Sequence, residues 1–316
     1  RRRGLMLSRT ASNLYWIGRY MERAEFTTSL VEATIRLASL GLRTESDPAW
    51  RSALAVVGAM EDFEATKENF GAFAARRFLT LGNENPSSIR YCLAAARDNA
   101  RAARNALSRE AWETINRAWL AIRGRTSPGG TQATLAMVDA LRAETRGFEG
   151  ALQRMLRSEG YWFVRLGSMI ERADNTARLL DVKYYLLLPE GEKVGGTLDR
   201  DQWNTILHIV SARLAYRLLY PEGLRPWLVA DLLVFRRELP RSLHYAAAET
   251  VELLAECGAR TGRQGEADRL ARQRLSALES DNITALFQRG LHEWLSRFID
   301  DNAALGRAIA QQFRLP

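Results

Sequence analysis

Residues 18–25 read GRYMERAE and residues 167–174 read GSMIERAD, so the string Gly-x-x-x-Glu-Arg-Ala-acid occurs twice, 149 positions apart (167 − 18). Around each copy, apolar residues recur mostly every three or four positions, which is the period of one face of an α-helix. They are Leu14, Ile17, Met21, Ala24, Val31, Ile35 and Ala38 around the first copy, and Phe163, Leu166, Ile170, Ala173, Ala177, Leu180, Tyr184 and Leu187 around the second. The spacing predicts two equivalent helices of roughly 25–35 residues each.

The rest of the chain also has the composition of helices. Its 8 prolines lie at the boundaries of long stretches rich in Ala, Leu, Arg and Glu, which are good helix formers. The alternating pattern of strands does not occur in the sequence. We therefore predict an all-α fold, a bundle of long helices.

Two further strings repeat in the same order. AWRSAL, which contains Trp50, matches QWNTIL, which contains Trp203, at an offset of 153. ENPSSIRY, which contains Pro86, matches ELPRSLHY, which contains Pro240, at an offset of 154. Because the offset stays nearly constant, these strings indicate an internal repeat of about half the chain.

The repeat predicts one helical domain over residues 6–316. Its homologous halves, about residues 6–150 and 151–316, would pack against each other around a pseudo-twofold axis. We expect no linker between the halves, because residues 146–163 read as helix throughout.

Composition excludes several classes of protein. With 47% hydrophobic and 26% charged residues, the chain is typical of globular proteins. No apolar run is long enough to span a membrane, and no signal peptide is recognisable, so we expect a cytoplasmic protein. The 2 cysteines and 3 histidines have no ligand spacing, so we expect neither a metal nor another cofactor. The net charge of +8 is spread along the chain as Arg, which makes a nucleic-acid partner unlikely.

The repeated string has a structural interpretation. Glycine inside a helix costs about 1 kcal/mol relative to alanine, so its presence in both copies indicates that the two helices approach closely there. Adjacent residues on a helix cannot pair well with each other. We therefore expect Glu22 to pair with Arg172, and Glu171 with Arg23, across the helix crossing.

The same string also has functional interpretations. Glu22 with Glu25, and Glu171 with Asp174, form acid pairs at i and i+3 that could together hold Mg²⁺ or a pair of metal ions. Alternatively, the arginines of both copies could bind a carboxylate or phosphate, because guanidinium groups match these anions geometrically. Arg9, Arg19, Arg23 and Arg172 are the candidate arginines, with Asn13 and Asn175 near them in the sequence.

The proline strings precede predicted helices. Ser87, Ser88 and Ser242 are placed to cap or begin these helices. Arg241 beside Ser242 could instead bind an anion at a helix N-terminus. Trp50 and Trp203 are expected to anchor the core.

With these strings in view, the sequence resembles the bacterial alpha-E family, an alpha-helical domain named for a Glu-Arg motif. The resemblance rests on MLSRTASNLYWIGRYMERAE at 6–25, RLGSMIERADNTARLLDVKYY at 165–185 and LPRSLHY at 239–245. It covers nearly the whole chain. Two positions depart from it: Phe26 stands where an Asn like Asn175 is expected, and Leu239 where one like Asn85 is expected.

The resemblance implies a partner. Members of this family occur beside, or fused to, circularly permuted ATP-grasp proteins, often together with a transglutaminase-like protease. This context implies an amide- or peptide-ligation system in which the ATP-grasp protein performs the ATP chemistry. We therefore expect a non-catalytic binding or scaffold partner that presents an acidic peptide or amino-acid substrate. The alternative is a helical enzyme that uses Glu22, Glu171 and Asp174 as acid/base groups or metal ligands.

Overall fold

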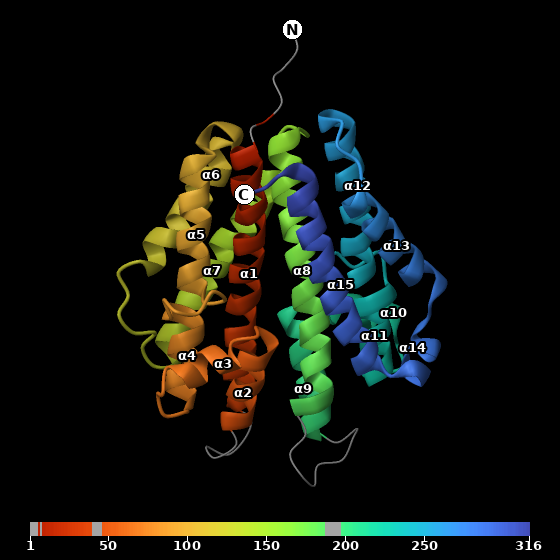
Figure 1. The fold of residues 1–316 in the computed structure, drawn as a ribbon. Helices are drawn as coiled ribbons and strands as arrows, with labels where there is room; N and C mark the ends of the chain where they lie inside the picture. Colours follow the sequence, from red (N-terminus) through yellow and green to blue (C-terminus); the bar gives the residue numbers. More distant parts are fainter. Residues whose placement is uncertain (1–5, 7, 40–45, 187–196) are drawn as a thin grey trace.

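The computed structural model describes residues 6, 8–39, 46–186 and 197–316. Within these residues all regular secondary structure is helical, with fifteen α-helices, one short 3-10 helix at Arg104–Ala106 and no strand (Figure 1). The predicted all-α class is confirmed.

The first half of the chain contains α1 (Ser8–Ala38), α2 (Ser46–Val56), α3 (Met60–Ala65), α4 (Ala72–Leu81), α5 (Ile89–Ala102), α6 (Arg109–Ile122) and α7 (Thr131–Gln153). The second half contains α8 (Glu159–Leu186), α9 (Thr197–Ile209), α10 (Arg213–Leu219), α11 (Pro226–Phe235), α12 (Leu243–Thr261), α13 (Glu266–Ser280), α14 (Ile283–Arg289) and α15 (Leu291–Phe313).

Helices α1 and α8, which carry the two copies of the repeated string, lie side by side at the centre of the molecule (Figure 1). Helices α5 and α7 pack on α1, whereas α12 and α15 pack on α8. Because helices cover it on several sides, α1 is buried over most of its length, including polar positions such as Glu22. Trp50 and Trp203 are also buried and anchor the core as predicted.

The predicted helix lengths are right for the central pair only. Helices α1 and α8 have 31 and 28 residues, whereas the others range from 6 residues in α3 to 23 in α7 and α15. Short helices arise because turns interrupt stretches whose composition remains favourable for helix.

The prediction that residues 146–163 are helical throughout is wrong. Helix α7 ends at Gln153 and α8 begins at Glu159. The guanidinium of Arg157 donates hydrogen bonds of 3.2 Å to the carbonyl oxygens of Leu152 and Met155. The carbonyl oxygen of Leu152 also accepts from the backbone N–H of Met155 at 3.0 Å, so the arginine adds a second donor to a carbonyl that the turn already satisfies. No glycine or proline lies between residues 154 and 158, so the sequence does not mark this turn.

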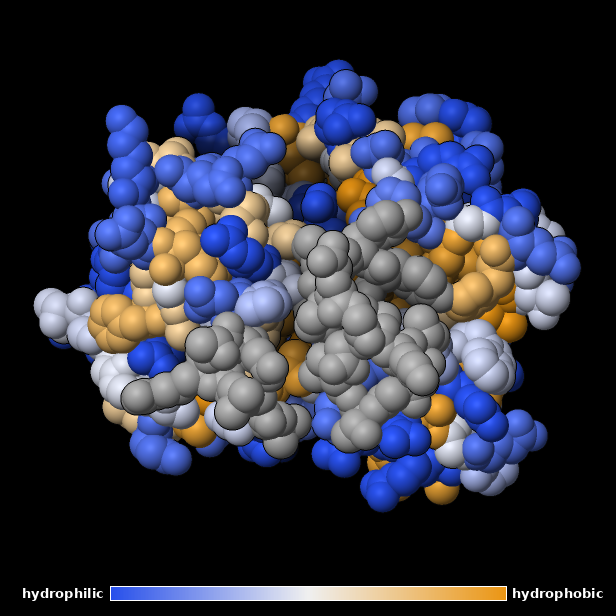
Figure 2. All heavy atoms as spheres, turned by 90° about the horizontal axis from the view of Figure 1, so that it is seen from below, coloured by the Kyte–Doolittle hydropathy of each residue, from blue (hydrophilic) through white to orange (hydrophobic). Residues whose placement is uncertain are grey.

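On the face shown in Figure 2, separate hydrophobic patches lie between hydrophilic side chains. Among the large hydrophobic residues exposed at the surface are Leu214, Leu218 and Leu219 of α10 and Trp227 of α11. None of the described helices is both long and apolar enough to cross a membrane.

Candidate functional site: the Glu-Arg crossing of α1 and α8

The two repeated glycines lie where α1 and α8 touch. A Cβ atom on Gly18 would lie 1.9 Å from the carbonyl oxygen of Val164, and one on Gly167 would lie 1.9 Å from that of Tyr15. Both contacts are with backbone atoms, which cannot turn aside as a side chain can. Only glycine therefore allows the helices to approach this closely. The predicted close approach is confirmed.

The two Glu-Arg pairs span this crossing as predicted. Arg172 donates to Glu22 through Nε and Nη2, at 3.0 and 2.7 Å. Arg23 donates to Glu171 through the same two atoms, at 2.5 and 3.0 Å. Both carboxylates are buried, and each receives one arginine in a two-pronged arrangement that fits carboxylate geometry.

The arginine of each pair also contacts the segment that precedes another helix. The third nitrogen of Arg23, Nη1, donates to the carbonyl oxygen of Pro86 at 3.3 Å, just before α5. Nη1 of Arg172 donates in the same way to Pro240 at 3.2 Å, just before α12. The repeated proline strings are therefore the partners of the repeated Glu-Arg strings, a relation that spacing alone did not reveal.

Serine caps complete these helix starts. The hydroxyl oxygen of Ser88 accepts from the backbone N–H of Tyr91 at 3.1 Å, and that of Ser242 accepts from Tyr245 at 3.0 Å. Capping by Ser88 and Ser242 is therefore confirmed.

A second arginine reaches each buried glutamate, and here the two copies differ. Arg19 donates through Nε to Glu171 at 2.5 Å. Arg241 donates through Nη1 to Glu22 at 2.8 Å and through Nη2 to Glu25. Serines stand at the corresponding positions of the other copies, Ser168 for Arg19 and Ser87 for Arg241. Arg241 therefore binds protein carboxylates, and its predicted alternative role as an anion site at a helix N-terminus is not supported.

Two clusters result. We name the Glu22 cluster by its members Glu22, Glu25, Glu149, Arg165, Arg172 and Arg241, and the Glu171 cluster by Glu171, Arg19 and Arg23. The Glu22 cluster has three carboxylates and three guanidinium groups, and its member Arg165 also lies 3.6 Å from the carboxylate of Glu249. The Glu171 cluster has one guanidinium more than carboxylates, so it is a net cation.

Sequence reasoning missed two members of the Glu22 cluster. Glu149 on α7 accepts from Arg172 at 3.3 Å and from Arg165 at 3.2 Å. Neither Glu149 nor Arg165 belongs to a repeated string, so no local signal distinguishes them from other charged residues of amphipathic helices. Arg165 lies on α8 itself, and the packing of α7 against α1 brings Glu149 to the crossing.

The arginines keep both buried glutamates ionised. Burial by itself would raise the pKa of Glu171, but the charges of Arg23 and Arg19 outweigh it and lower that pKa from 4.5 to about 2. Arg172 and Arg241 likewise outweigh burial and lower the pKa of Glu22. A carboxylate that stays ionised at neutral pH and is already bound by two guanidinium groups is poorly suited to donate or accept protons.

The crossing does not fit the predicted four-carboxylate metal site. Asp174 is bound by Arg178 one turn away at 2.7 Å, and Glu171 is bound by Arg19 and Arg23. Among the described residues, the carboxylates that come within ligand distance of one another are Glu22, Glu25 and Glu149.

Those three carboxylates already have arginine partners. The cavity between them measures about 10 Å³, which is the room of about one water molecule. A cation there would have to displace guanidinium groups, so the residues present do not fit a resident metal.

The remaining candidate, Asn175, is buried, and its amide nitrogen has no hydrogen-bond partner within the described residues. Phe26, at the corresponding position of the first copy, is buried in the apolar core. This position therefore has different roles in the two copies, and nothing in the structure explains the asparagine.

Aromatic rings border the cationic Glu171 cluster. The guanidinium carbon of Arg19 lies 5.4 Å from the ring centre of Trp16, and that of Arg23 lies 5.9 Å from Tyr20. The rings of Trp16 and Tyr20 stack with centres 5.4 Å apart, and Tyr91 of α5 meets Tyr20 at 6.3 Å. We name Trp16, Arg19, Tyr20, Arg23 and Tyr91 the aromatic-arginine face. The side chains of Arg19 and Arg23 are 18% exposed and Tyr91 is 37% exposed, so this face reaches the surface.

Comparison with known proteins gives one match. The model of the Alpha-E family, described as a predicted alpha-helical domain with a conserved ER motif, matches residues 6–313. No curated protein and no solved structure matches the chain. The match covers nearly the entire chain and both Glu-Arg strings that form the buried pairs. This chain therefore belongs to the Alpha-E family.

Proposed function

We propose that this protein is a non-catalytic binding or scaffold partner of an ATP-grasp peptide- or amide-ligase system, and that it presents an acidic peptide or amino-acid substrate to that enzyme. The observation that carries the proposal is the state of the motif carboxylates. Glu22 and Glu171 are buried and each is bound by two arginines, with room beside Glu22 for about one water molecule. Such groups hold helices together and leave no space for a substrate.

The alternative, a helical enzyme that uses Glu22, Glu171 and Asp174, finds less support. All three carboxylates are held by arginines, and two of them are buried. Catalysis by these groups would require breaking ion pairs inside the protein, which is costly when a charge is left behind.

The aromatic-arginine face is the surface we assign to recognition of the acidic substrate. It carries the excess positive charge of the Glu171 cluster next to the exposed ring of Tyr91 and the half-buried rings of Trp16 and Tyr20. Arginine and tyrosine are both common at the centres of protein interfaces, where a guanidinium can bind a carboxylate while a ring contributes apolar contact.

We also infer that the two halves of the chain are homologous and related by a pseudo-twofold axis. Reciprocal contacts support this: Arg23 binds Glu171 and Pro86, while Arg172 binds Glu22 and Pro240. In this view Arg19 and Arg241 each arose in one half only, after the halves diverged. The Glu171 cluster, which contains Arg19, is the one that is cationic. A cytoplasmic location and a transglutaminase-like protease as an additional partner belong to the same proposal.

Co-purification with a circularly permuted ATP-grasp protein from the same organism tests the proposal. We expect a stable complex, and ligation of an acidic amino acid or peptide only when both proteins are present. Tyr91→Ala should weaken ligation of the acidic substrate by the complex, because it removes an exposed ring of the aromatic-arginine face. Phe73→Ala, which removes an exposed ring on α4, is the matched control and should have no effect. ATP turnover or stoichiometric bound metal in the purified chain alone would overturn the proposal.

A further inference from the structure

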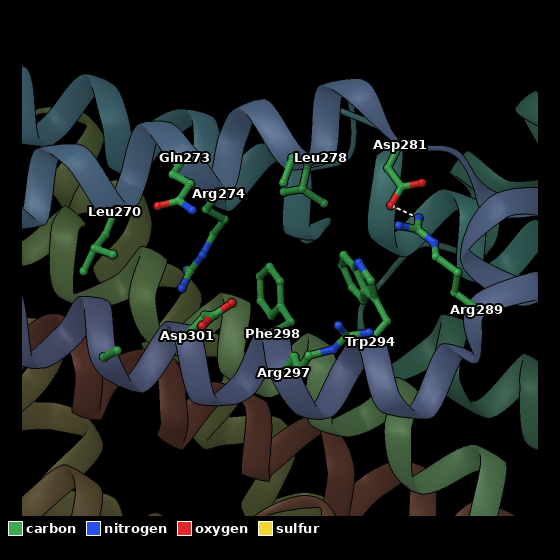
Figure 3. A pocket seen from close by; sticks show the side chains of 12 residues that line it. Leu270, Gln273, Arg274, Leu278, Asp281, Arg289, Trp294, Arg297, Phe298 and Asp301 are labelled. Atoms are coloured by element: carbon green, nitrogen blue, oxygen red, sulfur yellow. Dashed lines mark hydrogen bonds and ion pairs between the residues drawn. The ribbon is translucent and has the colours of Figure 1, made fainter.

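A groove between α13 and α15 has the size of a small-molecule site. The two helices lie side by side, with Arg289 of α14 at one end (Figure 3). The cavity between them measures about 390 Å³, within the range of roughly 300–1,000 Å³ typical of ligand pockets. Its apolar lining includes Leu270, Leu278, Trp294 and Phe298.

Arg274 is fixed inside this groove. It extends from α13 toward α15 (Figure 3) and donates from Nη1 to the side-chain oxygen of Asn302 at 2.7 Å. Asn302 is itself buried and donates to the carbonyl oxygen of Ile170 in α8 at 2.9 Å. The guanidinium carbon of Arg274 lies 4.8 Å from the ring centre of Phe298. Arg274 is therefore held in place from the core side.

The charge of Arg274 is not neutralised by a direct ion pair with any described residue. Burial lowers its pKa to about 10, and the more distant carboxylates of Asp301 and Asp174 oppose this only in part. This contrasts with Arg289 at the end of the groove, which is paired with Asp281 (Figure 3). A partly desolvated guanidinium without a direct counter-charge is costly, and an anion bound beside it would repay that cost.

The groove has a net positive charge and an aromatic wall. Three guanidinium groups line it, those of Arg274, Arg289 and Arg297, against the two carboxylates of Asp281 and Asp301. The rings of Trp294 and Phe298 stack with centres 5.4 Å apart and planes inclined by 23°. They form an aromatic wall against which a ring or an alkyl chain can pack.

We propose that this groove binds a small organic anion whose flat apolar body packs on Trp294 and Phe298 and whose acidic group contacts Arg274. The carboxylate, sulfonate and phosphate groups all suit a guanidinium fork. The site lies on α13 and α15, apart from the Glu-Arg crossing, and does not depend on the proposed partnership with an ATP-grasp protein.

Two fluorescent probes with the same body test the proposal. 1-Anilinonaphthalene-8-sulfonate carries an acidic group, whereas N-phenyl-1-naphthylamine is the same molecule without it. We expect the sulfonate to bind the full-length protein at least about tenfold more tightly, because a charge-assisted hydrogen bond is worth about 1.5–3 kcal/mol. Arg274→Met should abolish that preference and leave binding of the neutral probe nearly unchanged. Trp294→Ala should weaken binding of both probes.

Arg272→Met is the matched control, because Arg272 is exposed on the same helix and does not line the groove. It should bind both probes like the unmodified protein. Equal affinity of the unmodified protein for the two probes would overturn the proposal, as would unchanged sulfonate binding by Arg274→Met. Circular dichroism shows whether each variant is folded. If Arg274→Met does not fold, Trp294→Ala decides: weaker binding supports the site, and unchanged binding refutes it.

Discussion

The buried pair between Glu22 and Arg172 makes a quantitative prediction about stability. Glu22→Gln removes a charge that Arg172 and Arg241 share, and each of these keeps one other acidic partner, Glu149 and Glu25 respectively. Arg172→Gln leaves Glu22 with Arg241 alone. Because the charge left behind keeps a partner in each case, we expect each change to cost about 3 kcal/mol, the lower end of the range for breaking a buried ion pair.

The double variant should cost less than the two single changes together. Once Arg172 is absent, Glu22→Gln no longer breaks the two-pronged contact, so the coupling free energy should be about 2 kcal/mol. Urea unfolding of the four proteins, followed by circular dichroism at neutral pH, measures each free energy of unfolding.

The sequence neighbour Arg23 provides the matched control. It binds Glu171 instead of Glu22, so Glu22→Gln combined with Arg23→Gln should be additive within about 0.5 kcal/mol. Additive effects of Glu22→Gln and Arg172→Gln would refute the direct pairing. If Glu22 coupled equally to Arg172 and to Arg23, general electrostatics and not the direct contact would account for the coupling free energy.

Three further predictions concern the same crossing. Gly167→Ala should destabilise the protein by at least about 2 kcal/mol, because its Cβ would overlap the Tyr15 carbonyl. The control Gly150→Ala lies in α7 with open space around it and should stabilise the protein by about 0.5–1 kcal/mol. Equal effects of the two changes in thermal unfolding would contradict this prediction. The pKa of Glu171 in the folded protein lies below its usual 4.5, so the stability that this residue contributes is fully present above pH 4.5 and is lost as the pH falls toward 2. Urea unfolding at a series of pH values should show this loss, and Glu171→Gln should make the free energy of unfolding depend less steeply on pH. Ser242→Ala should cost about 1 kcal/mol by removing the cap of α12, and Ser242→Thr should recover most of it; a neutral Ser242→Ala would show that the cap is dispensable.

The sequence alone determined the helical class and predicted the Glu-Arg pairing at the central crossing. Apolar periodicity identified α1 and α8, because the buried face of a helix places an apolar residue in the sequence every three or four positions. The paired glycines and the Glu-Arg strings identified the contact between them, because an adjacent Glu and Arg on a helix need partners elsewhere. The serine caps of α5 and α12 were also predictable, since capping is a local interaction.

Tertiary structure decided which other groups reach that crossing and whether it is open. Glu149 and Arg165 belong to no repeated string, so nothing in the neighbouring sequence identifies them. Only the packing of α7 brings Glu149 to Arg172. The second arginine of each cluster, Arg19 or Arg241, breaks the repeat, so the repeat could not predict which cluster is cationic. The break at residues 154–158 was hidden because no glycine or proline marks it.

The groove beside Arg274 was equally beyond the sequence. Its wall comes from α13 and α15, and its depth depends on how far apart these helices pack. Periodicity is a property of one segment, and it determines which residues share a face. Distances between segments, and with them burial, charge balance and cavities, depend on the packing of many side chains at once, and only the folded structure decides them.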